Sequence, residues 1–234
     1  MDSTHRRGFF GRLAGAASAF GVALTAPLAA SAQAPPAETW LSGVKGTHRC
    51  FFDISKHMNG VGLLHVLNYL NTYAAAYKAP AGQVAAVSSF YGIGPASSMP
   101  LAFNDAMWAK YGLSEYTGLK DATGKPYARN PFHRPTATEL HLLMQGMQTP
   151  TIPMFAGAMP GLGIENLQKM GTTFLICGNA FGAWCAELEV RGKGKAADLQ
   201  KELGANLLPG VTLVPAMVIA IEQAQAAGIA YNRQ

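Results

Sequence analysis

The sequence predicts a single α/β domain whose sheet is mostly parallel and flanked by helices. Short apolar runs of strand type alternate with helical segments, and this alternation is typical of right-handed βαβ units. The composition agrees with a folded chain, since 49% of the 234 residues are hydrophobic and only 13% are charged. Disordered chains have the opposite balance, so a mainly disordered protein is excluded.

The expected elements follow from apolar runs and from apolar residues at helical spacing. Strands are expected over 49–54, 84–90, 171–177, 211–214 and, at an edge of the sheet, 229–231. Helices are expected over 63–78, 99–111, 138–146, 164–170, 179–189, 196–203 and 215–227. Pro215 suits the first turn of the last helix. The segment 112–161 interrupts the alternation and is expected to be a surface insertion with a small hairpin.

The first residues resemble a bacterial twin-arginine export signal. Arg6-Arg7 precedes an aromatic pair and a weakly apolar run rich in Gly and Ala, and Ala30-Ser31-Ala32 has the pattern that signal peptidase cuts. We therefore expect a signal peptide over 1–32, an Ala/Pro-rich linker over 33–46 and the domain over 47–234. The mature protein is expected in the periplasm, with no membrane span. An uncleaved anchor or a basic amphipathic helix is the alternative.

The charge distribution argues against nucleic acid as a partner. Arg6, Arg7 and Arg12 against Asp2 contribute +2 of the net charge of +5 inside the signal. The remaining basic residues form no stripe, and such a stripe marks most nucleic-acid-binding surfaces.

Three cysteines, Cys50, Cys177 and Cys185, would meet an oxidising compartment after export. An odd number leaves at least one thiol free, capped or paired between chains. Cys185 is the natural disulfide partner for Cys177, although a strand-to-helix corner can hold the two too far apart. Cys50 lies inside the first strand and is expected in the core.

Cys177 is the residue best placed for chemistry. It stands where a strand ends and a helix begins, at the edge where parallel sheets bind their ligands. The start of a helix stabilises negative charge, and the thiolate is the form that takes up sulfane sulfur. The alternative is a packing residue, because cysteine is among the most often buried residue types.

Other known site patterns are weak or missing. Tyr91-Gly92-Ile93-Gly94 is only part of a phosphate-binding glycine loop, and no C-x-x-C, H-E-x-x-H or G-x-S-x-G pattern occurs. His141, Met144 and Met147 share a helical spacing that could suit a soft metal such as copper, although such a stripe is more often core. No cofactor is expected.

Two segments resemble the DsrE/DsrF-like family. One is 167–180, a helix that leads through Gly171 into a strand closed by Cys177, and the other is 211–231, with its valine-rich strand and final tyrosine. The resemblance implies a flavodoxin-like fold that assembles into homo-oligomers and a persulfide carried by Cys177. Many relatives have His-Gly where this chain has Tyr91-Gly92, which argues against proton transfer there.

The expected function is binding or transfer of sulfane sulfur through Cys177, as a sulfurtransferase or sulfur carrier. Its partner would be a sulfur donor or acceptor protein, or a small sulfur species. The expected substrate-binding residues are Gly178, Asn179, His57, Asn59 and Tyr91. The alternative is a non-catalytic periplasmic binding or assembly module in which Cys177 is structural, and a copper binder is a third hypothesis.

Overall fold

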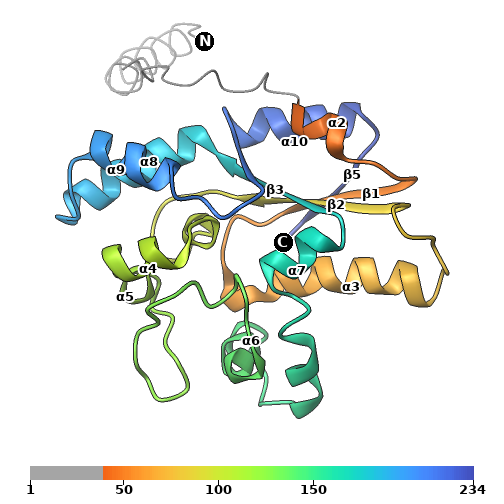
Figure 1. The fold of residues 1–234 in the computed structure, drawn as a ribbon, viewed down its shortest axis with the longest axis horizontal. Helices are drawn as coiled ribbons and strands as arrows, with labels where there is room; N and C mark the ends of the chain where they lie inside the picture. The colour runs from red at the N-terminus through yellow and green to blue at the C-terminus, as the bar shows by residue number, and fades with distance from the viewer. Residues whose placement is uncertain (1–38) are drawn as a thin grey trace, which may run out of the picture. The chain divides into compact units, whose positions relative to one another are not determined.

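The computed structural model describes residues 39–234 (Figure 1). Within them, a five-stranded sheet has the order β4-β3-β2-β1-β5, and every neighbouring pair is parallel. The strands are β1 (His48–Asp53), β2 (Val84–Phe90), β3 (Thr172–Cys177), β4 (Val211–Val214) and β5 (Ala230–Arg233). The predicted α/β class, the five strands and the edge position of the last one are confirmed. The export signal expected over 1–32 lies outside the described residues.

Helices connect the strands. The α-helices are α2 (Thr39–Gly43), α3 (Val61–Ala75), α4 (Asp105–Tyr111), α5 (Leu113–Thr117), α6 (Leu140–Gly146), α7 (Ile164–Lys169), α8 (Gly178–Val190), α9 (Ala196–Gly204) and α10 (Met217–Ala226). Short 3-10 helices are η1 (Met58–Gly60), η2 (Met99–Ala102), η3 (Ala137–Glu139) and η4 (Pro153–Ala158). The helix expected over 99–111 is divided, because the Asn104 side chain accepts the N–H of Met107 and starts α4 anew. Pro215 precedes α10 and does not open it.

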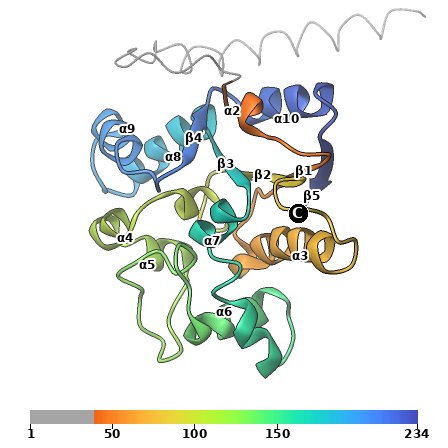
Figure 2. The same cartoon turned by 45° about the vertical axis from the view of Figure 1, so that its right-hand side comes forward.

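The strand order explains which helices cover which face of the sheet. The chain adds β2, β3 and β4 in one direction, so right-handed crossovers place α3, α7 and α8 on one face. The return from β4 to β5 runs back across the sheet on the other face, through α10. Figures 1 and 2 show α3 and α7 on one side of the sheet, with α10 and α2 on the other. We call these sides the α3 face and the α10 face.

Alternation along the strands fills two separate cores. Phe174 and Ile176 of β3 point into the larger core on the α3 face. Their neighbours Leu175 and Cys177 point into the smaller core on the α10 face, where Met217 packs. Cys177 therefore lies under α10.

The domain begins earlier in the chain than the sequence suggests. Residues 39–46 were expected to belong to a linker, but 39–43 form α2, and Trp40 and Val44 are buried in the core of the α10 face. The linker prediction is wrong for this part, because two large apolar side chains among small residues are enough to dock a single helical turn.

The segment 112–161 is also more integrated than a surface insertion. Leu113, Phe132 and Leu143 are fully buried in the core of the α3 face. The small hairpin is present as an antiparallel bridge between Lys120 and Pro126. The expectation of a surface insertion is wrong for these residues, because they supply part of the main core.

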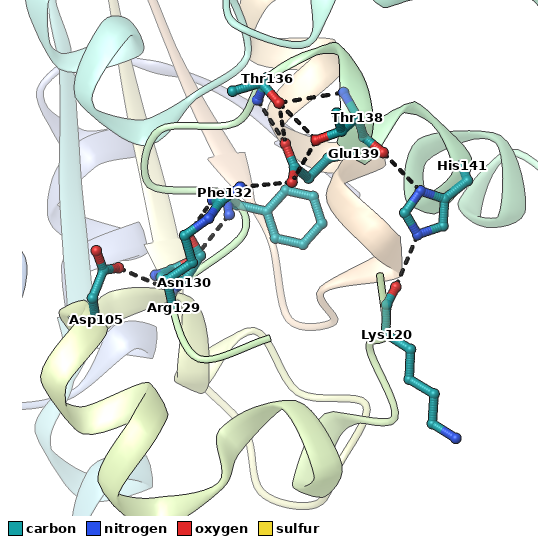
Figure 3. A network of polar contacts seen from close by, with 9 residues as sticks. All are labelled: Asp105, Lys120, Arg129, Asn130, Phe132, Thr136, Thr138, Glu139 and His141. Atoms are coloured by element: carbon teal, nitrogen blue, oxygen red, sulfur yellow. Dashed lines mark hydrogen bonds and ion pairs between the residues drawn. The ribbon is translucent and has the colours of Figure 1, made fainter. Parts of the chain in front are cut away.

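Polar contacts fix the course of the same segment (Figure 3). The buried carboxylate of Glu139 pairs with Arg129 at 2.6 Å and accepts the backbone N–H of Thr136 at 2.7 Å, which closes a capping box. The Asn130 side-chain oxygen accepts the N–H of Phe132 at 3.0 Å, and the backbone N–H of Asn130 donates to the Asp105 carboxylate at 3.0 Å. These contacts satisfy a loop backbone that would otherwise be buried without partners.

Candidate functional site

Cys177 ends β3, and its side chain contacts the first turns of two helices. The Sγ atom accepts the N–H of Ala180, the third residue of α8, at 3.4 Å. It also accepts the N–H of Met217, the first residue of α10, at 3.3 Å. Two amide groups at helix N-termini thus point at one sulfur atom, and both favour negative charge there.

The topology creates this arrangement. β3 continues into α8 on the α3 face, whereas β4 continues into α10 on the α10 face. Neighbouring parallel strands whose helices go to opposite faces leave a crevice at their carboxyl ends, which is where α/β proteins bind ligands. Cys177 lies at that point.

The β3–α8 corner and the β4–α10 corner contact each other directly through their backbones. The N–H of Asn179 donates to the carbonyl of Pro215 at 3.1 Å. A Cβ atom on Gly178 would lie 3.1 Å from the carbonyl oxygen of Val214 and 3.2 Å from that of Pro215. A glycine at position 178 therefore allows the β4–α10 corner to approach Cys177 closely enough for the Met217 amide to reach Sγ.

The thiol lies just below the surface. Cys177 is 6% exposed, while Asn179 and Pro215 on either side of it are exposed. A sulfur-carrying role needs access past these two residues, whereas a purely structural role needs none. Burial thus fits the alternative hypothesis, and the two amide donors fit the chemical one.

Tyr91 follows β2, next to β3 in the sheet, and packs against both cores. Burial, with Asp53 beside it, raises the pKa of Tyr91 to about 12. The phenol therefore stays protonated at neutral pH and can donate a hydrogen bond.

The sequence did not single out the partners of Asp53. This buried carboxylate accepts hydrogen bonds from Ser89 at 3.1 Å and from Tyr231 at 2.7 Å. Because the contacts join β1, β2 and β5, only the strand order brings these residues together.

His57 and Asn59 do not share a site with Cys177. His57, which was expected to bind substrate, is buried, its Nδ1 accepts the N–H of Asn59, and burial lowers its pKa. The Asn59 side chain points to Gln145 of α6, on the α3 face. Among residues 39–234, neither has a recorded contact with Cys177, so their predicted role beside this thiol has no geometric support.

The other two cysteines belong to the core of the α3 face. All three thiols are free and buried. Burial raises the pKa of Cys50, and it raises that of Cys185 to about 12. Cys185 lies on the opposite face of the sheet from Cys177, so the disulfide considered between them is wrong.

The two candidate copper ligands His141 and Met144 are already engaged in contacts with the backbone. Both ring nitrogens of His141 contact backbone carbonyls, those of Thr138 and Lys120, and the Sδ atom of Met144 accepts the N–H of Ile152 (Figure 3 shows the histidine). Among residues 39–234, no group of three or more His, Cys, Asp or Glu side chains is placed to hold a metal ion.

Comparison with protein-family models, with curated proteins and with solved structures finds no match for this chain. Among the described helices, none has both the length and the apolar character needed to cross a membrane. The functional argument therefore depends on the geometry around Cys177.

Proposed function

We propose that this protein is an exported sulfur-handling protein of DsrE/DsrF-like type, which binds or transfers sulfane sulfur through Cys177. The observation that supports the proposal is the pair of amide donors, from Ala180 and Met217, on one sulfur atom. A thiolate and the anionic end of a persulfide are both stabilised by such donors.

The chemistry is a thiolate exchange. The Cys177 thiolate attacks the outer sulfur of a donor persulfide, a new S–S bond forms, and the donor's own S–S bond breaks. The donor leaves as a thiolate with the electron pair of that bond, and Cys177 keeps the transferred sulfur. No oxidant or reductant is consumed. Delivery to an acceptor thiol is the same exchange in the other direction.

Apolar side chains beside the site support assembly or partner binding there. Val218, directly after the Met217 donor, is 75% exposed, and Ile219 of α10 is exposed as well. Leu213 of the edge strand β4 is also exposed. Val218 and Ile219 are neighbours on α10, and exposed apolar side chains that lie together commonly mark interaction sites. We include homo-oligomer formation in the proposal, and light scattering that reports a monomer at micromolar concentration would contradict it.

The alternative function is a non-catalytic periplasmic module in which Cys177 fills the core of the α10 face. Its supporting observation is the 6% exposure of Cys177. It predicts no sulfur uptake by the wild-type protein.

Intact mass after incubation with polysulfide tests the proposal. The wild-type protein is expected to gain about 32 Da, the mass of one sulfur atom, at Cys177. Cys177→Ala is expected to abolish the gain, while Cys185→Ala, which also removes one buried thiol, keeps it. An adduct that persists in Cys177→Ala, or no adduct on the wild type, would refute the proposal.

The export part of the proposal is tested separately. Replacing Arg6 and Arg7 by Lys is expected to leave the precursor in the cytoplasm, because the twin-arginine route requires the pair. Normal export and processing of the double variant would exclude that route.

A further inference from the structure

The connection between β1 and α3 contains a turn with an unusual backbone. Met58, Asn59 and Gly60 have φ values of 36°, 52° and 93°. This left-handed region is uncommon for residues other than glycine, so the first two of these residues are held there by their surroundings. We call Met58–Gly60 the left-handed turn.

The imidazole of His57 is one of the groups that hold the left-handed turn. It is 8% exposed, and its Nδ1 atom accepts the backbone N–H of Asn59 at 3.1 Å. The ring also forms a hydrogen bond with the backbone of Pro95, while the backbone N–H of His57 donates to the Ala96 carbonyl at 3.0 Å. Proline has no backbone N–H, so the ring donates to the Pro95 carbonyl. Because one ring nitrogen accepts and the other donates, this network assigns a neutral imidazole with its proton on Nε2.

The opposite side of the left-handed turn packs against α6. A Cβ atom on Gly146 would overlap the carbonyl oxygen of Met58, so the helix and the turn are in direct backbone contact. The Asn59 side chain donates to Gln145 of α6 at 3.5 Å. The left-handed turn is therefore enclosed between α6 and the ring of His57.

The surroundings of His57 favour its neutral form. Within residues 39–234, the ionisable groups on the elements around it are exposed or have other partners. They are exposed Lys56, Asp53 with its partners Ser89 and Tyr231, Tyr91 beside Asp53, His65 of α3 in contact with Gln234, His141 of α6 between two backbone carbonyls, and Glu139 paired with Arg129. Burial therefore lowers the pKa of His57.

We propose that His57 is a pH-sensitive contact, which holds the left-handed turn in place only while its ring is neutral. Protonation by a solvent proton adds a hydrogen to Nδ1, and both ring nitrogens are then donors. The new Nδ1–H faces the N–H of Asn59, so the hydrogen bond between them is lost. Without it, the turn is released from its left-handed backbone and from α6. Cys177 takes no part in these contacts, so the proposal does not depend on sulfur chemistry.

Hydrogen exchange at two pH values tests the release. In the wild-type protein, the protection factors of the Asn59 and Gly60 amides, corrected for intrinsic exchange, are expected to be about tenfold lower at pH 5.0 than at pH 7.5. The reason is that opening lets a histidine with an ordinary pKa of about 6.5 bind a proton that the closed form excludes.

Two asparagine variants separate His57 from general effects of acid. His57→Asn retains an oxygen that can accept the N–H of Asn59, as in an Asx turn, but it cannot be protonated. It is expected to keep the same protection at both pH values. His133→Asn is the matched control, because it removes another partly buried histidine whose pKa is lowered by burial, and it is expected to show the wild-type loss.

Nitrogen NMR of the histidine rings tests the proposal in the wild-type protein, without any variant. The ring of His57 is expected to carry its proton on Nε2 at pH 7.5 and to titrate below the ordinary value of about 6.5. A proton on Nδ1 at pH 7.5 would overturn the proposal, and so would equal wild-type protection at the two pH values. An undiminished loss of protection in His57→Asn, or its disappearance in His133→Asn, would overturn it as well.

Discussion

Cys177 and Cys185 are both buried, but their surroundings differ in one decisive respect. The Sγ atom of Cys177 accepts two backbone N–H groups at the starts of α8 and α10. Cys185, about two turns into α8, lies among Phe181, Trp184 and Leu188 in the core of the α3 face, and burial raises its pKa to about 12. Burial alone thus disfavours a thiolate, and the oriented amides are what distinguish Cys177.

Alkylation should show the largest difference between the two thiols. At pH 8, a pKa of about 12 leaves about one Cys185 thiolate in ten thousand. Because the Sγ atom of Cys177 accepts two backbone N–H groups, iodoacetamide under native conditions is expected to label Cys177 at least about tenfold faster than Cys185, as measured by peptide mass spectrometry. Equal labelling at pH 8 would remove the contrast.

Serine substitutions should separate the two sites in stability. A serine oxygen at position 177 can accept the same two N–H groups, so Cys177→Ser is expected to change the free energy of unfolding by less than about 1 kcal/mol. Cys185→Ser places a hydroxyl in an apolar core and is expected to cost about 1–3 kcal/mol. Chemical denaturation measures both. A loss at position 177 as large as that at 185 would favour the purely structural cysteine.

A proline at position 217 should remove one of the two amide donors while keeping the helix. Met217 is the first residue of α10, where proline is tolerated, and the extended backbone of Ala216 suits a following proline. Met217→Ala is the matched control, because it also removes the buried side chain but retains the N–H. We expect sulfur uptake to be about tenfold slower in Met217→Pro than in Met217→Ala, as expected for one lost hydrogen bond to a charged group. Equal rates would show that the Met217 amide is not needed.

Much of the fold was predictable because its signals are local. Apolar runs such as 84–90 and 172–177 form strands wherever they can be covered on both sides, and strand–helix alternation implies parallel pairing. The segments that were misjudged depend on distant partners. Trp40 docks on α10, and Phe132 fills the core beside α3, although both lie in stretches whose composition is typical of loops.

The candidate site around Cys177 likewise has features that were predictable from the local sequence and features that depend on distant segments. A cysteine that closes a strand before a helix is visible in the sequence, and so is the Ala180 amide three residues later. The Met217 amide is forty residues away in the chain, and it reaches Cys177 only because β4 pairs with β3 while α10 crosses the opposite face. His57 follows the first strand in a polar stretch, so the local pattern suggested a substrate-binding residue, but its side chain is buried and its backbone N–H donates to Ala96 of a neighbouring loop.

The sequence by itself determined the α/β class, the strand positions and the placement of Cys177 at a strand end, because these depend on residues within one turn or one strand. The tertiary structure decided the strand order, the face on which each cysteine lies and the second amide on the sulfur. It also decided the packing of His48 of β1 against the ring of Tyr73 of α3. These features join segments that are far apart in the chain, and no local pattern of hydrophobicity encodes which strands become neighbours.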